Sequence, residues 1–214
     1  MTGKINKTLI ISTVLCLLPI ILALILYDQL PEQIAVHFDQ TGTPDNYLPK
    51  VLAVWGLPIA LSLINLYTHF RLNNDPKREN ASFILKLAAK WAVPLISLIV
   101  LPITYFMAIG AEIPIGAISS AVCGVFIVIC GNYLPKCKRN YTVGIKLPWT
   151  LDSEEVWNKT HHFAGFVWVI GGIIFIANAF FHSAYVTVGL VILLVALPLI
   201  YSYLAYKSLH AAEK

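Results

Sequence analysis

The amino-acid sequence predicts an all-α membrane protein with six transmembrane helices and with the N-terminus and C-terminus both cytoplasmic. Hydrophobic residues make up 58% of the 214 residues and charged residues only 12%, about half the charged share of a soluble domain. The apolar residues form six runs, each long enough at about 1.5 Å per residue to cross a hydrocarbon layer of about 30 Å. Lysine and arginine gather on alternate connections between these runs, as the positive-inside rule requires.

The six apolar runs are expected to be helices, because backbone polar groups in lipid must be satisfied within their own segment. They are rich in Leu, Ile and Val without strict alternation, which argues against barrel strands. The first run is too long for a signal peptide and has no small-x-small cleavage site, so we expect a retained helix. Prolines inside the spans should kink them. The runs are residues 8–27, 51–70, 87–109, 113–134, 163–181 and 184–206, and the prolines are Pro19, Pro58, Pro94, Pro102 and Pro198.

The distribution of basic residues predicts the orientation and the location. With a cytoplasmic N-terminus, all 15 lysine and arginine residues lie inside except Lys50, so we expect a multi-pass protein of the cell membrane. The net charge of +4 is accounted for by the anionic headgroups of membrane lipids. No direct binding of nucleic acid is therefore expected.

The chain is expected to divide into three parts. Residues 1–70 form an N-terminal module of two helices joined by an external loop, residues 28–50. Residues 71–112 hold a cytoplasmic linker and the third helix. Residues 113–214 hold the last three helices and a cytoplasmic loop, residues 135–162.

The external loop is the one outside connection with room for structure of its own. Its segment "QIAVHF" has the composition of a short strand, and "DQTGTPDN" is dense in turn-forming residues. The loop carries four acids and one lysine. Either external loops simply lack lysine and arginine, or this loop is an anionic surface for a cationic or apolar ligand, with His37, Asp39 and Asp45 as candidate binding residues.

The residues of the spans argue against ion-coupled transport, and the absence of catalytic motifs argues against an enzyme. No Asp, Glu, Lys or Arg lies deep in any span, and ion-coupled transport depends on such groups. Phosphate-loop, zinc-protease and nucleophile-elbow motifs are absent from the sequence. The polar residues Asn65 and Asn178 are expected to bond between helices. No catalytic residue, cofactor or metal is therefore expected.

The fifth helix has a defined entrance in the cytoplasmic loop. Asp152 is expected to cap it, with Glu155 completing a capping box, so that the helix starts near Ser153. Glu155 and Lys159 have the i,i+4 spacing of a favourable ion pair. Five residues of this helix share one face, and the two glycines among them should allow a close helix neighbour. They are Trp157, His161, Gly165, Trp168 and Gly172.

Capping does not explain the segment before this entrance. Residues 140–157 read N-x-x-x-G-I-K-L-P-W-T-L-x-S-E-E-V-W, with "GNYLPK" upstream and "HHFAG" downstream. This pattern resembles the signature of the SdpI family of bacterial toxin-immunity membrane proteins. The external loop is similar to the N-terminal module of unknown function that often precedes it. The matching residues are Asn132, Asn140, Gly144, Pro148, Trp149, Thr150, Leu151 and Trp157, whereas Lys146 and Leu147 replace the Arg-Thr that is common in the family.

The resemblance implies a function on both sides of the membrane. Family members of the founding type protect a producer against its own secreted killing peptide. They also signal by drawing a transcriptional repressor to the inner face. For this chain the implied partners are a secreted peptide toxin outside and a cytoplasmic repressor inside. The candidate repressor-binding residues are the motif residues together with Lys146 and His161.

Two alternatives stay open on the sequence. The protein could instead be a small transporter or lipid-handling membrane protein. Within the motif, Trp149 and Lys146 exceed what helix capping needs, which favours a contact surface for a cytoplasmic partner. The other interpretation makes Trp149 an interfacial anchor and Lys146 a contact to lipid headgroups.

Overall fold

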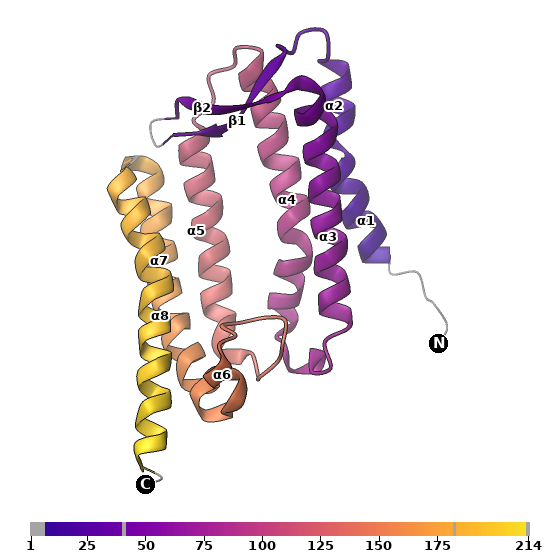
Figure 1. The fold of residues 1–214 in the computed structure, drawn as a ribbon. Coiled ribbons are helices and arrows are strands. Elements are labelled where there is room, and N and C mark those ends of the chain that lie inside the picture. The colour runs from indigo at the N-terminus through magenta and orange to yellow at the C-terminus, as the bar shows by residue number, and fades with distance from the viewer. Residues whose placement is uncertain (1–6, 40–41, 182, 213–214) are drawn as a thin grey trace. The chain divides into compact units, whose positions relative to one another are not determined.

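The computed structural model describes residues 7–39, 42–181 and 183–212 of the chain as helices and one β-hairpin (Figure 1). The elements follow the chain in this order: α1 (Lys7–Leu17), α2 (Pro19–Ile25), β1 (Gln33–Phe38), β2 (Pro44–Pro49), α3 (Leu57–Asn73), α4 (Phe83–Ala108), α5 (Ile115–Tyr133), α6 (Pro148–Asp152), α7 (Glu154–Phe181) and α8 (Ala184–Ala212).

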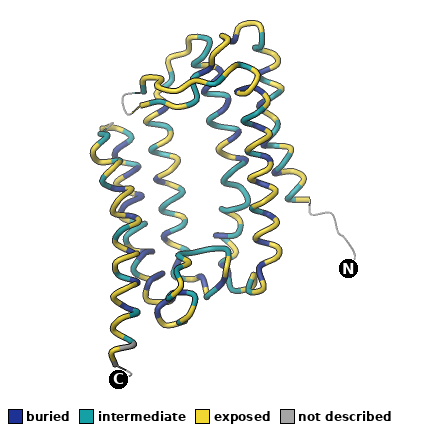
Figure 2. Tube along the Cα trace, viewed as in Figure 1, coloured by how far each residue is buried: buried dark blue, intermediate teal, exposed yellow. Residues whose placement is uncertain are grey.

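Six helical segments of the described chain are long and apolar enough to cross a membrane, which confirms the predicted number of spans. Exposed residues recur along the spanning helices (Figure 2), and they include large apolar side chains such as Ile25, 72% exposed, and Phe180, 80% exposed. Apolar surface of this extent is suited to lipid rather than water. The segments are Lys7–Ile25, Leu52–Asn73, Phe83–Ala108, Ile115–Lys136, Glu154–Phe181 and Ala184–Leu209.

The chain forms two compact units. The first comprises Met1–Arg71 and Ala89–Ile115, and the second comprises Leu72–Ala88 and Gly116–Lys214. The first unit therefore holds α1 to α3, the hairpin and most of α4, and the second holds α5 to α8 and the short linker before α4.

The predicted break at Pro19 is confirmed in the first unit. Helix α1 ends at Leu17, and α2 begins anew at Pro19, whose ring nitrogen cannot donate to the preceding turn. The prolines of α4 and α8 differ, since these two helices continue through Pro94, Pro102 and Pro198.

Pro58 acts through the turn that precedes α3. Residues Leu52–Gly56 form a π-helical turn, in which the amide of Leu57 donates to the carbonyl of Leu52. The next bond of this register would require an amide at residue 58, which proline lacks. The carbonyl of Ala53 instead accepts a hydrogen bond from the hydroxyl of Tyr105 at 3.1 Å, and Tyr105 is fully buried.

We expect Tyr105→Phe to destabilise the protein by about 1–3 kcal/mol, because it leaves the buried carbonyl of Ala53 without a donor. Thermal unfolding in detergent measures the effect. Tyr185→Phe is the matched control, since Tyr185 is 92% exposed and should melt like the unchanged protein. Equal melting temperatures for both variants would contradict the assigned role of Tyr105.

The β-hairpin caps one end of the first unit. Its first strand is the predicted "QIAVHF" segment, residue for residue, and it pairs antiparallel with β2. Ile34 is fully buried in a cluster that contains Ala53, Leu101 and Tyr105. The hairpin is thus anchored to the helices by its apolar face.

Glycines hold α5 and α7 together in the second unit. A Cβ atom at Gly172 would lie 2.8 Å from the carbonyl oxygen of Gly124, and one at Gly165 would lie 2.8 Å from that of Gly131. The reciprocal distances, from Gly124 and Gly131, are 2.7 and 2.9 Å. Two pairs of glycines, seven residues apart on each helix, therefore allow the two backbones to touch. The predicted face of small residues on the fifth span is confirmed.

Candidate functional site

The motif loop, residues 137–152, folds around the buried side chain of Asn140. The amide oxygen of Asn140 accepts hydrogen bonds from the backbone of Thr142 (3.0 Å) and Val143 (2.7 Å). Its amide nitrogen donates to the carbonyl of Lys138 at 2.9 Å and to the sulfur of Cys137 at 3.1 Å. Because Asn140 is fully buried and satisfied on both sides, it fixes the turn that opens the loop.

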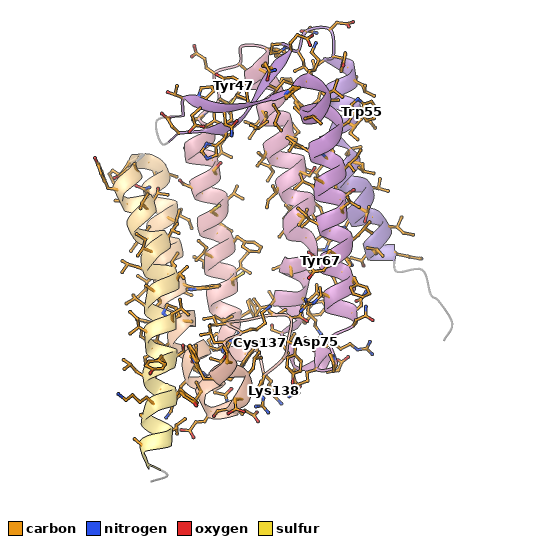
Figure 3. All side chains as sticks on the ribbon, in the orientation of Figure 1. Tyr47, Trp55, Tyr67, Asp75, Cys137 and Lys138 are labelled. Atoms are coloured by element: carbon orange, nitrogen blue, oxygen red, sulfur yellow. The ribbon has the colours of Figure 1, made fainter. Side chains whose placement is uncertain are left out.

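The linker between α3 and α4 supplies a second anchor, Asp75. Figure 3 shows Asp75 and Cys137 at the same end of this unit. The carboxylate accepts hydrogen bonds from the hydroxyl of Thr142 at 2.5 Å, from the amide of Tyr141 at 3.0 Å and from the amide of Lys77 at 2.7 Å. Five residues after Asp75 in the same linker, the side chain of Asn80 donates to the carbonyl of Arg139 at 2.8 Å.

The charge state of Asp75 follows from these bonds. Burial by itself raises the pKa of this carboxyl, but the bonds from Thr142 and from the amides of Lys77, Tyr141 and Thr142 outweigh burial and hold the pKa below its ordinary value. The carboxylate therefore stabilises the folded loop at neutral pH, and this contribution is lost only as the pH falls through the lowered pKa.

The centre of the loop rests on His161 and Trp157 of α7. The amide of Ile145 donates to Nε2 of His161 at 3.0 Å, while Nδ1 bonds to the carbonyl of Trp157 at 2.7 Å. Nε2 therefore carries no proton and Nδ1 carries one, so this buried ring is neutral. The Trp157 ring stacks on it at 3.9 Å and donates to the carbonyl of Cys137 at 2.7 Å.

Gly144 is required where the loop crosses this ring. Its φ of +113° lies in a region that side chains rarely adopt. A Cβ atom there would come within 2.4 Å of Nε2 of His161. Two independent reasons, backbone conformation and contact, thus demand glycine.

The short helix α6 is fastened at both ends. At its start the hydroxyl of Thr150 accepts from the amide of Leu147 at 2.9 Å and donates to the carbonyl of Ile145 at 2.8 Å. At its end the guanidinium of Arg139 donates to the carbonyls of Leu151 (3.0 Å) and Asp152 (2.5 Å). Pro148 occupies the first turn, where a missing amide proton is tolerated.

Trp149 attaches α6 to α8. Its indole nitrogen donates to the hydroxyl of Ser202 at 3.0 Å, and its ring lies 5.7 Å from that of Tyr203, edge-on. An apolar groove of about 300 Å³ opens beside these rings, lined by Trp149, Leu199, Ile200, Tyr203 and Leu204. The indole is thus held in place rather than extended into solvent.

The motif loop offers a small set of exposed residues. Lys146 and Pro148 are exposed, and the ammonium of Lys146 donates to the carbonyl of Thr142 at 2.8 Å. Asn132 lies apart from the loop, on an exposed position of α5. The remaining candidate residues, namely Asn140, Gly144, Thr150, Trp157 and His161, are brought together and build the loop from within.

The hairpin brings two of its three candidate residues together. Nδ1 of His37 lies 2.5 Å from the carboxylate of Asp45, and both side chains are largely exposed. Asp39 instead accepts a hydrogen bond from the amide of Thr43 at 2.9 Å and so stabilises the turn. Among the described residues, no group of three or more His, Cys, Asp and Glu side chains could hold a metal ion.

Comparison with known proteins now identifies the family. Residues 136–202 match the SdpI/YfhL protein family, and residues 14–61 match a domain of unknown function. Over 211 residues the chain is 31% identical to Immunity protein SdpI of Bacillus subtilis (strain 168), covering 97% of this chain and 100% of that protein. This chain belongs to the SdpI/YfhL family. No solved structure matches it.

The family assignment confirms the resemblance seen in the motif and the location in the cell membrane as a multi-pass protein. The SdpI/YfhL match spans the motif loop together with α7 and the larger part of α8. The match to the domain of unknown function includes the complete hairpin. Both structured connections of the chain therefore lie within matched regions.

The predicted cap of α7 at Asp152, and with it the capping box with Glu155, is wrong. Asp152 does not cap α7, because it belongs to the last turn of α6. Ser153, with an extended backbone, is the capping residue, and its hydroxyl accepts from the amide of Val156 at 3.3 Å. The start near Ser153 and the ion pair between Glu155 and Lys159, at 2.8 Å, are confirmed.

Two residues that hold the motif loop, Asp75 and Arg139, were not predicted from the sequence. Both lie among other polar residues of cytoplasmic connections, where charged side chains are usual. Asp75 carries one weak signal, because it stands directly before Pro76 in "NNDPK", a pattern typical of turns. Nothing local to Asp75 points to a loop more than sixty residues away.

Proposed function

We propose that this protein protects the cell membrane against a secreted killing peptide. The observation that carries the proposal is the similarity to Immunity protein SdpI, which extends over 97% of this chain and all of its relative. Similarity of this extent includes both the hairpin and the motif loop. The proposal therefore concerns the whole protein rather than a shared helix pattern.

A killing assay in a sensitive bacterial host tests this function. The host expresses this chain, Immunity protein SdpI as a positive control, or an empty vector, and is treated with culture supernatant from a strain that secretes the killing peptide. We expect survival with the first two and death with the third. Membrane levels of each protein are measured in parallel.

Death of cells that contain this chain at the level of the positive control would contradict immunity to that peptide. Liposomes with the purified protein then address the alternative function. Movement of a solute or lipid across these liposomes, above that of protein-free liposomes, would favour a transporter or lipid-handling protein.

We infer that the motif loop faces the cytoplasm and the hairpin faces outside. Every lysine and arginine except Lys50 lies on the side of the motif loop under this orientation. A reporter active only in the cytoplasm should work when fused to the C-terminus, and it should be inactive when inserted in the turn between β1 and β2. The reverse pattern would overturn this orientation.

The finer part of the proposal is signalling to a cytoplasmic repressor through the exposed surface of the motif loop. Lys146 and Pro148 are available for contact, whereas Trp149 supports α6 and is a poor test residue. Lys carries its charge as a compact point, unlike the flat fork of the Arg common in the family. The matching surface on a partner is therefore an acidic group without strict planar geometry.

We expect Lys146→Ala to abolish peptide-induced relief of repression by the cytoplasmic repressor, while leaving membrane level and survival unchanged. The physical reason is that the exposed Lys146 contributes little to packing but presents a charge. Lys138→Ala is the matched control, since Lys138 is also exposed in the motif loop. Equal losses in both variants would point to general attraction to anionic lipids instead of a specific partner.

A further inference from the structure

The first unit contains a buried polar cluster that the motif and the hairpin do not use. His69 of α3 is 1% exposed, and Asn65, one turn earlier on the same helix, is fully buried. Both lie in the spanning segment Leu52–Asn73. Asn65 is the residue that the sequence predicts to bond between helices, whereas His69 carries no such signal in the sequence. An ionisable side chain inside a span suggests a site by default.

Both side chains converge on one oxygen atom, the hydroxyl of Ser12 in α1. Nδ2 of Asn65 donates to it at 2.9 Å, and Nε2 of His69 lies 3.2 Å from it. Asn65 also donates to the hydroxyl of Thr13 at 3.1 Å. The predicted bonding of Asn65 between helices is thus confirmed.

The direction of the Ser12 hydroxyl proton determines which nitrogen of the His69 ring is protonated. Ser12 donates this proton to the carbonyl of Leu9 at 3.1 Å, so its oxygen accepts from both neighbours. Nε2 of His69 must then carry a proton, which leaves Nδ1 as a bare acceptor in a neutral ring.

Two acceptors in this cluster lack a donor. Oδ1 of Asn65 and Nδ1 of His69 are buried and have no hydrogen-bond partner among the described residues. They belong to side chains that stand four residues apart on one face of α3 and converge on Ser12. Within a membrane span, a buried polar atom without a partner is strongly unfavourable. Each of the two atoms therefore calls for a hydrogen-bond donor.

We propose that the contact between α1 and α3 binds buried water, which donates hydrogen bonds to Oδ1 of Asn65 and to Nδ1 of His69. A water has the two O–H groups that these acceptors need. A cation such as ammonium has the donors too, but both acceptors belong to buried side chains within a spanning segment, where an unpaired charge is costly. Charge thus selects a neutral ligand.

Solid-state NMR of the full-length protein, labelled with ¹⁵N at histidine and reconstituted in phosphatidylglycerol–phosphatidylethanolamine liposomes, tests the site. Each ring is identified by the signal that a single His→Gln variant loses. We expect His69 to carry its proton on Nε2, and we expect magnetisation transfer from water protons to its unprotonated Nδ1. Replacing the water with D₂O should abolish this transfer.

Two other histidines of the chain are internal controls. His161 is equally buried, but both its ring nitrogens bond to protein atoms, so it should receive no transfer from water. His162 is exposed and should receive it readily. If His69→Gln does not fold, single His→Gln variants of the five other histidines still assign the His69 ring by elimination.

Three results would overturn the proposal. The first is a His69 ring without water transfer, like that of His161. The second is a ring protonated on Nδ1, which would make that atom a donor. The third is a His69 signal that shifts when ammonium chloride, but not sodium chloride, is added, because that ligand would be a cation.

Discussion

Gly144→Ala is expected to unfold the motif loop. The substitution forces a side chain into a left-handed backbone, at a cost of about 1–3 kcal/mol. It also drives Cβ toward Nε2 of His161, which would lie 2.4 Å away. The amide of Ile145 must then move away from the ring. The buried Nε2 atom is left without a hydrogen-bond donor, which destabilises the protein by about 1–3 kcal/mol more. We therefore expect a total of about 3 kcal/mol or more, seen as a large fall in melting temperature and membrane level.

A second glycine separates the two causes. Gly110 also has a positive φ, of +99°, but a Cβ atom there would meet no other atom within 4 Å. Gly110→Ala should therefore show the backbone strain alone, and its melting temperature should lie between those of Gly144→Ala and the unchanged protein. If the two variants melt alike, the contact between Gly144 and His161 does not hold the loop.

Gly172→Ala is expected to separate α5 from α7. The added methyl group would lie 2.8 Å from the carbonyl oxygen of Gly124 and 2.9 Å from the amide nitrogen of Val128. Both atoms belong to backbone, so no side chain can rotate away. Overpacking of this kind costs about 1–3 kcal/mol, and within lipid no hydrophobic effect restores the association of the helices.

Thermal unfolding of Gly172→Ala, compared with Gly189→Ala, measures this loss. Gly189 also lies in a spanning helix, but a Cβ atom there would meet nothing within 4 Å. Gly189→Ala should be neutral or stabilising by up to about 1 kcal/mol, because alanine is the better helix former. Adding Gly165→Ala to Gly172→Ala should deepen the defect, since Gly165 meets Gly131 in the same way. A melting temperature of Gly172→Ala equal to that of the control would refute the close approach of the two helices.

The elements that follow from local pattern agree with the sequence prediction. Runs of apolar residues suffice for the six spans, because crossing a membrane depends on length and hydropathy within one segment. The strand Gln33–Phe38 is equally local, since its alternating apolar residues stand between turn formers. The face of α7 that carries Gly165 and Gly172 follows from helical periodicity alone. The contact of this face with Gly124 and Gly131 does not follow from periodicity. Periodicity predicts which face of a helix carries small residues, but not which helix packs against that face.

What the sequence by itself determined is therefore the class of protein, the number of spans, the hairpin strand and, through the motif, the family. The tertiary structure decided what the motif residues do. Asn140, Gly144 and His161 hold the motif loop from within, and Asp75 reaches it from a linker 67 residues before Thr142. Ser153 rather than Asp152 caps α7, because Asp152 lies in the last turn of α6. These roles depend on hydrogen bonds between segments that are distant in sequence. Such segments meet only when the helices pack, so a local sequence pattern cannot predict which residues will bond.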